Sequence, residues 1–291
     1  MVNIDSLEIH VSNHCNMSCM WCMHFSPYES FHFINLENLQ TELNVLNGKI
    51  KVGTIRLLGG EPLLNTKIDK VIGIAKNSKV SNKVSIATNG FLLKLWMDNV
   101  MWKDIDECEV TLYPHIKDKH DEILKICHSI AEKFKVKFYI YYCEYFRKPG
   151  SLSMTNNEEL TKQVFKTCLT RKWQCFNLFD GKIYLCPQAF AFPRNGIGEL
   201  DKRDYIDIHS KTFESDLQVY VNRTEPLKIC SYCYGSCGDL SKHCQIKIKK
   251  NPLDMVSSEY DEGIDMGYLN ELLTSSDVKS NMGTLIKIEQ F

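Results

Sequence analysis

Residues 15–22 read Cys-Asn-Met-Ser-Cys-Met-Trp-Cys and place three cysteines within one short loop. The loop directly follows Leu7–Val11, a run of alternating apolar and polar residues that predicts a β-strand. Three thiolates can hold a four-iron four-sulfur cluster and leave one iron open to another ligand. They can also hold a zinc ion if a fourth ligand, His14 or His24, completes the site.

The first half of the chain alternates strand-like runs with segments of helical spacing, which predicts repeated βα units. Strands are predicted at Leu7–Val11, Thr54–Leu58, Val84–Ala87, Glu109–Tyr113 and Val136–Tyr142, and helices at Leu36–Leu46, Ile68–Ala75, Leu92–Met101 and Asp121–Phe134. Such units imply an α/β fold with a parallel sheet or barrel, in which functional loops follow the C-terminal ends of strands. The cysteine loop and the residues 59–62, 88–90 and 113–115 all fall at that edge.

The pattern changes after Pro149 and Gly150, because residues 151–157 are polar and rich in turn-forming residues, which predicts a linker. We therefore expect residues 1–150 to form one domain and residues 151–291 to form a smaller module organised by metal. Within the second part, residues 176–185 predict a β-hairpin.

Cysteine is the outlier of the composition, with 13 in 291 residues. An odd number of thiols in a chain without a recognisable signal peptide points to metal binding or redox catalysis rather than disulfides. The 35 basic and 36 acidic side chains nearly cancel, so no basic surface for nucleic acid or membranes is expected. No apolar run is long enough for a transmembrane helix, and the sequence predicts a cytoplasmic protein.

The cysteine loop with its aromatic residue Trp21, followed after the next strand by Gly-Gly-Glu-Pro at residues 59–62, resembles the radical S-adenosylmethionine enzymes. Their signature is Cys-x3-Cys-x-aromatic-Cys, with Gly-Gly-Glu-Pro at the end of the second strand. The resemblance implies a partial (β/α) TIM-like barrel. It also implies that Cys15, Cys19 and Cys22 hold a [4Fe-4S] cluster whose open iron binds S-adenosylmethionine.

The same resemblance implies a set of cofactor-binding residues, namely Trp21, Gly59, Gly60, Glu61, Pro62, Thr88 and Asn89. The two glycines would allow close approach to the methionyl group, and Glu61 would accept a hydrogen bond from its ammonium. Trp21 is expected near the adenine, and Thr88 and Asn89 at the nucleoside. From the residues alone, the glycines also fit a strand-end turn, Trp21 a core position and Asn89-Gly90 an ordinary turn.

A second group of cysteines lies in residues 151–291. Cys168 is separated by twelve residues from Gly181, four more precede Cys186, and further cysteines follow from residue 230 onward. This order resembles the twitch and SPASM modules, which hold auxiliary clusters in the same superfamily. The full two-cluster SPASM pattern is not reached, so the resemblance implies one auxiliary [4Fe-4S] cluster. Its expected ligands are Cys168, Cys186, Cys230 and Cys233, with Cys237 competing for the last position.

A zinc ribbon with the same ligands is the alternative for this second group. Cys108, Cys127 and Cys143 fall in predicted strands or helices and are expected to be buried thiols.

The pair of clusters resembles the twitch dehydrogenases that act on aminocyclitols and sugars. The implied reaction starts with a 5′-deoxyadenosyl radical that abstracts hydrogen from a small substrate, and the auxiliary cluster accepts the remaining electron. A flavodoxin or ferredoxin would supply electrons, and Arg147, Glu144 and Tyr113 are the catalytic candidates by their position at strand ends.

Three other functions stay open. An epimerase would need a thiol hydrogen donor, and Cys175, Cys237 and Cys244 are available. A SPASM maturase of peptides would be expected to carry a leader-binding domain, for which the predicted strand at residue 7 leaves no room. A non-catalytic iron–sulfur or zinc scaffold would have no use for the Gly-Gly-Glu-Pro motif.

Overall fold

The computed structural model describes residues 1–247, 251–274 and 283–289, and the chain divides into two compact units. The first unit comprises Met1–Met17, Glu29–Glu144 and Gly283–Phe291, and the second comprises Ser18–Tyr28 and Tyr145–Met282. The cysteine loop crosses this division, with Cys15 in the first unit and Cys19 and Cys22 in the second. The domain boundary expected near residue 150 stays a prediction.

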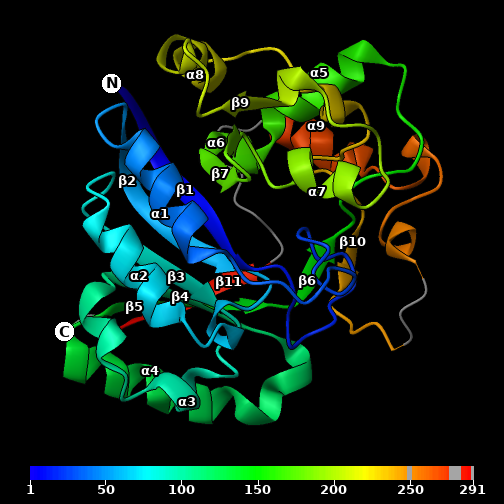
Figure 1. The fold of residues 1–291 in the computed structure, drawn as a ribbon. Helices are drawn as coiled ribbons and strands as arrows, with labels where there is room; N and C mark the ends of the chain where they lie inside the picture. Colours follow the sequence, from blue (N-terminus) through cyan, green and yellow to red (C-terminus); the bar gives the residue numbers. More distant parts are fainter. Residues whose placement is uncertain (248–250, 275–282, 290–291) are drawn as a thin grey trace. The chain divides into compact units, whose positions relative to one another are not determined.

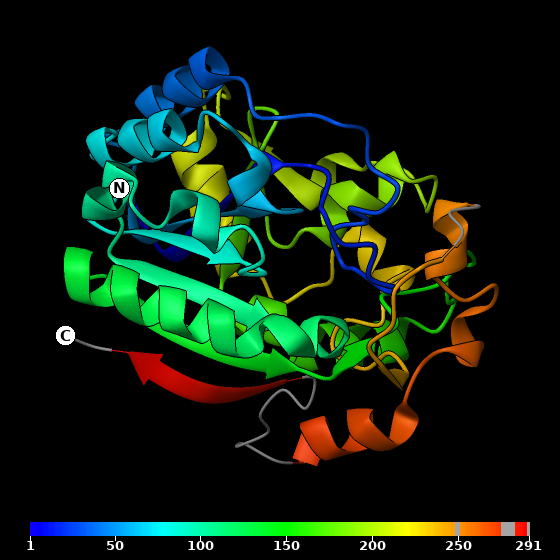
Figure 2. The same cartoon turned by 90° about the horizontal axis from the view of Figure 1, so that it is seen from below.

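The sheet of the first unit has the strand order β11-β5-β4-β3-β2-β1 (Figure 1). Neighbours from β1 to β5 pair in parallel, whereas β11 runs antiparallel to β5, beside which Figure 2 shows it in red. This arrangement confirms the α/β class and the partial TIM-like barrel. The strands are β1 Val2–Ser12, β2 Ile50–Gly59, β3 Val84–Thr88, β4 Glu107–Leu112, β5 Lys137–Cys143 and β11 Gly283–Glu289.

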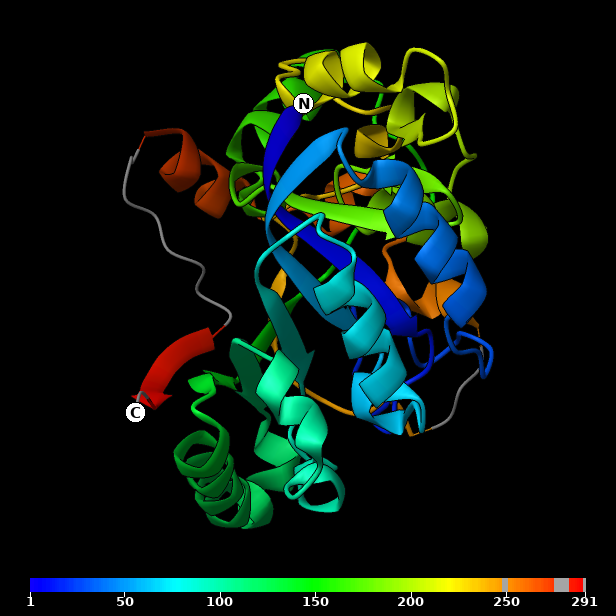
Figure 3. The same ribbon diagram turned by 60° about the vertical axis from the view of Figure 1, so that its left-hand side comes forward.

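Helices connect these parallel strands, and α1 and α2 lie side by side along the sheet (Figures 1 and 3). The helix α1 begins after Asn35, whose side chain accepts hydrogen bonds from the backbone N–H groups of Glu37 and Asn38, and it buries three leucines. Leu7–Val11, the predicted part of β1, is buried on both faces, as expected for a covered parallel strand. The helices are α1 Leu36–Leu46, α2 Ile68–Asn77, α3 Leu93–Trp96 and α4 His120–Phe134.

The helix predicted at Leu92–Met101 is wrong in its second half. The helix α3 ends at Trp96, and a separate 3-10 helix begins at Val100. The side chain of Asn99 accepts a hydrogen bond from Met101 N over 2.8 Å and so starts the second helix afresh. The strand β11 was not predicted, because its sequence alone does not indicate pairing with β5.

The second unit contains two small antiparallel groups of strands and five helices among its described residues. The predicted hairpin is confirmed, since β7 and β8 are joined by Asp180 and Gly181, whose φ angles of +51° and +66° suit a two-residue turn. The strands are β6 Tyr145–Arg147, β7 Cys175–Phe179, β8 Lys182–Tyr184, β9 Tyr205–Asp207 and β10 Leu240–Lys242. The helices are α5 Glu158–Thr167, α6 Leu169–Lys172, α7 Gln188–Arg194, α8 Phe213–Val221 and α9 Met266–Thr274.

Short 3-10 helices complete the described structure. They are η1 Pro62–Leu64, η2 Val100–Asp104, η3 Pro114–Lys119, η4 Lys202–Asp204, η5 Lys228–Ser231, η6 Pro252–Met255 and η7 Tyr260–Glu262. In the described part of the chain, no helix combines the length and apolar composition needed to cross a bilayer.

The linker predicted at residues 151–157 is partly structured. Ser151 is fully buried, its N–H donates to Tyr232 O over 2.9 Å, and it forms a β-bridge with Ser257. The polar, turn-forming residues of this segment predict a linker, but backbone groups of Ser151 pair with Tyr232 and Ser257, far along the chain. A hydrophobic cluster that includes Leu160 of α5 and Leu269 of α9 forms a core nearby in the same unit.

Candidate active site

The loop after β2 holds the end of β1 through its backbone. Gly60 N donates to Ser12 O over 2.7 Å, and Glu61 N donates to His14 O over 3.1 Å. A Cβ atom on Gly60 would lie 2.0 Å from His14 O, and one on Gly59 would lie 2.2 Å from Ser12 O. Gly59 also has a φ of +136°, which disfavours other residues. Both glycines therefore let this loop pack against the chain that enters the cysteine loop.

The carboxylate of Glu61 is buried and joins the loop after β2 to the loop after β3. It accepts hydrogen bonds from Leu63 N at 3.0 Å, Thr88 Oγ1 at 2.7 Å and Asn89 N at 2.9 Å. Burial raises the pKa of Glu61 to about 7, and these hydrogen bonds oppose the shift. Pro62 begins the 3-10 helix that follows. The expected contact between Glu61 and the ammonium of the cofactor stays a prediction.

Asn89 connects the loop after β3 with the first cysteine. Its Nδ2 donates to Asn16 Oδ1 over 2.7 Å and lies 3.7 Å from the sulfur of Cys15. Its Oδ1 accepts a hydrogen bond from Phe91 N. The structure thus brings Cys15, Glu61, Thr88 and Asn89 together at the C-terminal edge of the parallel strands. The sequence did not reveal Asn16 as a site residue, because nothing in the sequence around it indicates its contact with Asn89.

The second half of the cysteine loop is held by residues 244–246 of the same unit. Cys19 and Gln245 form a β-bridge, and Met20 N donates to Cys244 O over 2.9 Å. The side chain of Gln245 accepts from Ser18 N at 2.7 Å and donates to the sulfur of Cys19 at 3.2 Å. Gln245 is a site residue that the sequence did not reveal, because only the folded chain brings it to the loop.

Trp21 and Cys22 are also fixed within this unit. Trp21 has a left-handed φ of +61°. Its backbone N–H donates to the sulfur of Met255 over 3.4 Å, and Lys148 Nζ lies 5.6 Å from the centre of its indole ring. Burial raises the pKa of the Cys22 thiol, although backbone N–H groups of residues 24–26 favour the thiolate. The predicted contact of Trp21 with adenine stays a prediction.

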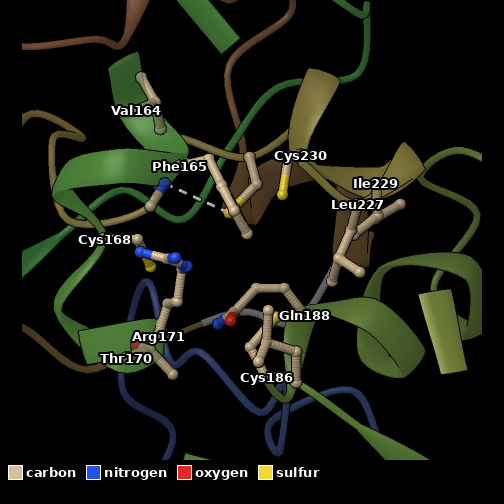
Figure 4. Close-up of a pocket in the computed structure, with 13 residues that line it drawn as sticks. Val164, Phe165, Cys168, Thr170, Arg171, Cys186, Gln188, Leu227, Ile229 and Cys230 are labelled. Atoms are coloured by element: carbon tan, nitrogen blue, oxygen red, sulfur yellow. Dashed lines mark hydrogen bonds between the residues drawn. The ribbon is translucent and has the colours of Figure 1, made fainter. Parts of the chain in front are cut away.

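The four cysteines predicted to hold an auxiliary cluster line one pocket of the second unit (Figure 4). Cys168 lies between α5 and α6, Cys186 follows β8, Cys230 belongs to η5, and Cys233 comes shortly after it. Gly235 N donates to the sulfur of Cys233 over 3.2 Å. In the described part of the chain, no three potential ligands meet at one point as the ligands of a single metal ion would. The four thiols are part of the lining of a pocket.

The chemistry of this pocket fits a metal-containing group. Burial raises the pKa of all four thiols, that of Cys233 to about 12, and the neighbouring thiols add to the shift at three of them. Raised pKa values favour neutral thiols, so these groups would need nearby positive charge to become thiolate ligands, and bound iron or zinc would supply that charge. A four-cysteine donor set is the usual ligand set of a [4Fe-4S] cluster.

The other cysteines are not among the residues that line this pocket, although Cys237 lies near enough to Cys233 to raise the pKa of its thiol. Cys237 belongs to the hydrophobic cluster of α5 and α9, with its sulfur 3.8 Å from Thr167 Oγ1. Cys108 and Cys127 are buried as expected, whereas Cys143 at the end of β5 is only half-buried, which corrects the expectation of a buried thiol. Cys143 is the last residue of β5, at the C-terminal end of the parallel strands.

Asp204 positions the turn that carries Cys230. Its carboxylate accepts from Lys228 N at 2.5 Å and from Ile229 N at 3.0 Å, and burial raises its pKa to about 6. The hydroxyl of Tyr220 donates to Asp204 O over 2.6 Å. No motif marked Asp204 in the sequence, because its partners lie 24 and 25 residues away.

Arg147 lines a second pocket of the same unit, together with Met23, Lys148, Thr170, Trp173 and Tyr268. Its guanidinium donates to Gly238 O over 2.5 Å, lies 3.4 Å from Asp265 Oδ2 and stacks 3.9 Å from the ring centre of Tyr268. Two residues of this pocket lining lie close in sequence to predicted cluster ligands: Met23 follows Cys22 directly, and Thr170 lies two positions after Cys168.

The two other catalytic candidates belong to the first unit. Tyr113 follows β4 and Glu144 follows β5, which places both at the edge where the site residues gather. The carbonyl of Tyr113 lies 3.0 Å from His120 Nε2.

Comparison with curated proteins finds GTP 3′,8-cyclases. That of Helicobacter pylori (strain ATCC 700392 / 26695) is 32% identical over 132 residues, covering 45% of this chain and 40% of the relative. That of Clostridium acetobutylicum is 36% identical over 95 residues, covering 31% of this chain and 29% of the relative. The chain therefore spans less than half the length of these relatives.

Among solved structures, the crystal structure of BtrN in complex with AdoMet and 2-DOIA has a TM-score of 0.49 and 16% identity, covering 79% of this chain and 92% of that chain. Streptococcus suis SuiB bound to S-adenosylmethionine has a TM-score of 0.34 and 20% identity, covering 46% of this chain and 33% of that chain. Residues 9–148 match the sequence profile of the Radical SAM superfamily. The match covers just under half of the chain, and residues 9–148, which contain the cysteine loop and the parallel strands β2 to β5, are therefore similar to a radical SAM domain.

Proposed function

We propose that the chain is a radical S-adenosylmethionine oxidoreductase of a small, sugar- or cyclitol-like substrate, with an auxiliary [4Fe-4S] cluster as electron acceptor. The radical SAM domain supports an enzyme that uses a [4Fe-4S] cluster and S-adenosylmethionine. The observation that carries the finer proposal is the pocket lined by Cys168, Cys186, Cys230 and Cys233. These cysteines come from three separate segments of the chain and converge on one pocket.

Cys15, Cys19 and Cys22 would hold the first cluster, which together with S-adenosylmethionine supplies the radical that removes one hydrogen atom from a carbinol carbon of the substrate. A base takes the hydroxyl proton, and one electron leaves to the auxiliary cluster, so that the alcohol becomes a carbonyl. Glu144 and Tyr113 are the proposed proton acceptors.

The pocket around Arg147 is the proposed substrate site in the second unit. It offers the cations of Arg147 and Lys148, the hydroxyl of Thr170 and the rings of Trp173 and Tyr268. A mixture of aromatic faces and convergent polar groups suits a hydroxylated ring, because the rings cover its C–H faces while the polar groups bond its hydroxyls.

A flavodoxin or ferredoxin is the proposed electron donor. We place the protein in the cytoplasm, because reduced thiols and low-potential clusters require a reducing compartment.

An epimerase is the second candidate, and Cys244 is the observation that favours it. Cys244 is exposed, and the backbone carbonyl of this residue accepts a hydrogen bond from the backbone N–H of Met20 in the cysteine loop. A thiol there can return hydrogen to a substrate radical. Turnover in deuterium oxide separates the two functions: oxidation gives a product that has lost two hydrogens, whereas epimerisation gives an isomer with one deuterium at the reacting carbon.

The proposal is tested with anaerobically reconstituted protein, dithionite and S-adenosylmethionine, in the presence of sugars, aminocyclitols and, because of the curated relatives, GTP. We expect 5′-deoxyadenosine to form in the wild type but not in the Cys15→Ala variant. A Cys175→Ser variant, which changes a thiol outside the proposed ligand sets, is the control. Absence of 5′-deoxyadenosine from the iron-loaded wild type would contradict the proposed function.

A further inference from the structure

The side-chain nitrogen of Gln188 is buried without a hydrogen-bond acceptor. Gln188 is the first residue of α7, two positions after Cys186, and only 2% of it is exposed. Its Nε2 has no partner among the residues that the structure describes. Buried N–H groups are nearly always hydrogen-bonded in folded proteins, because leaving one unpaired destabilises the fold, so an acceptor is expected at this position in the working protein.

Gln188 lines the four-cysteine pocket, and Figure 4 shows its amide extending into the pocket on the side of Arg171. The guanidinium of Arg171 stacks 4.6 Å from the ring centre of Phe165, and one of its nitrogens donates to Arg223 O over 3.0 Å. These contacts fix the cation at the pocket wall. Most of the remaining lining is apolar: Val164, Phe165, Leu185, Leu227 and Ile229.

The pocket is therefore asymmetric, with four thiols, the cation of Arg171, the amide of Gln188 and the hydroxyl of Thr170 among hydrocarbon side chains, and the hydroxyl does not pair with the amide nitrogen. The apolar residues provide no acceptor for the amide, and water is poorly stabilised against them. A group that fills the space between the thiols and carries negatively charged sulfur would supply the missing acceptor.

We propose that Gln188 is a positioning residue of the auxiliary cluster, whose Nε2 donates a hydrogen bond to a cluster or ligand sulfur and, together with Arg171, raises the reduction potential of the cluster. The inference rests on the proposed function, which places the cluster in this pocket. Reduction adds an electron, so donor groups and positive charge beside the sulfurs stabilise the reduced form. The pair Gln188 and Arg171 thereby makes the cluster a better acceptor for an electron from the substrate.

The test uses the Cys15→Ala, Cys19→Ala, Cys22→Ala triple variant as parent, because it should contain the auxiliary cluster alone. The midpoint potential is measured by redox titration followed by electron paramagnetic resonance. Gln188→Leu should make reduction about tenfold less favourable, which corresponds to a fall of about 59 mV. Gln188→Glu, which keeps the size but replaces the donor by a negative charge, should lower the potential at least as far.

Gln218→Leu is the matched control, since Gln218 is an exposed glutamine on α8 of the same unit. The reduction potential of the cluster in this variant should equal that of the parent. Iron content is measured on every sample. An unchanged potential in both Gln188 variants, with roughly four irons bound, would overturn the role of Gln188 and leave the cluster in place. A parent that binds zinc or no iron would contradict the auxiliary cluster itself, and the role of Gln188 with it.

Discussion

The side-chain amide of Gln245 donates a hydrogen bond to the sulfur of Cys19 over 3.2 Å, although 226 positions separate the two residues in sequence. The same side chain accepts a hydrogen bond from Ser18 N, so both ends of the amide are engaged with the cysteine loop. Cys19 is thus held by a residue of the second cysteine-rich part of the chain. A donor to a ligand sulfur stabilises the reduced form of a cluster.

Gln245→Leu should therefore lower the potential of the first cluster, making its reduction roughly tenfold less favourable, or about 59 mV. It should also slow the formation of 5′-deoxyadenosine, because less of the cluster is reduced. The measurement is a redox titration of a variant that lacks the four auxiliary cysteines, with Gln218→Leu as the control. An unchanged potential would show that Gln245 only supports the loop.

Glu61 should make stability depend on pH. Its pKa is raised from 4.5 to about 7 by burial, so its contribution to stability is fully present below pH 4.5 and is lost as the pH rises through about 7. Relative to Glu61→Gln, the wild type should lose on the order of 2–3 kcal/mol between pH 5 and pH 8. Denaturant unfolding of both proteins across this pH range measures the difference in their free energies of unfolding. A difference that does not change with pH would contradict the raised pKa of Glu61.

Gly60→Ala should destabilise the fold, because the added Cβ would lie 2.0 Å from the carbonyl oxygen of His14. We expect a loss of about 1–3 kcal/mol in the free energy of unfolding and weaker binding of S-adenosylmethionine. Gly73→Ala is the control, because nothing lies within 4 Å of its Cβ position on α2, and it should stabilise by up to about 1 kcal/mol. Equal stability of the two variants would contradict the close backbone contact.

Cys233 and Cys237 should differ as ligands. Cys233 lines the four-cysteine pocket, whereas Cys237 packs within the hydrophobic cluster of α5 and α9. Cys233→Ala should lose the auxiliary cluster, and Cys237→Ala should retain it with a modest loss of stability. Iron content and thermal unfolding of both variants check this expectation, and the reverse result would make Cys237 the fourth ligand.

The elements that the sequence predicts are those whose signals are local. The helix Leu36–Leu46 and the turn at Asp180 and Gly181 depend on residue spacing and turn chemistry, and both are confirmed. The helix at Leu92–Met101 failed at Asn99, where a side-chain cap outweighs apolar spacing.

The same distinction between local and long-range signals applies to the residues of the candidate site. The resemblance to twitch and SPASM modules implied the set Cys168, Cys186, Cys230 and Cys233, and all four line one pocket. Gln188 and Arg171 lie only two and three positions after Cys186 and Cys168, but no motif in the sequence indicates that their side chains line the pocket. Asp204 and Gln245 reach their partners only through long-range folding, which local patterns do not encode.

The two-cluster assignment is the central claim, and iron and zinc content after anaerobic reconstitution tests it most directly. The wild type should hold roughly eight irons as two four-iron clusters. Replacing Cys15, Cys19 and Cys22 by alanine should leave about half, and replacing Cys168, Cys186, Cys230 and Cys233 should leave the other half. Tightly bound zinc in the wild type, or loss of all iron when the first three cysteines are replaced, would contradict the assignment.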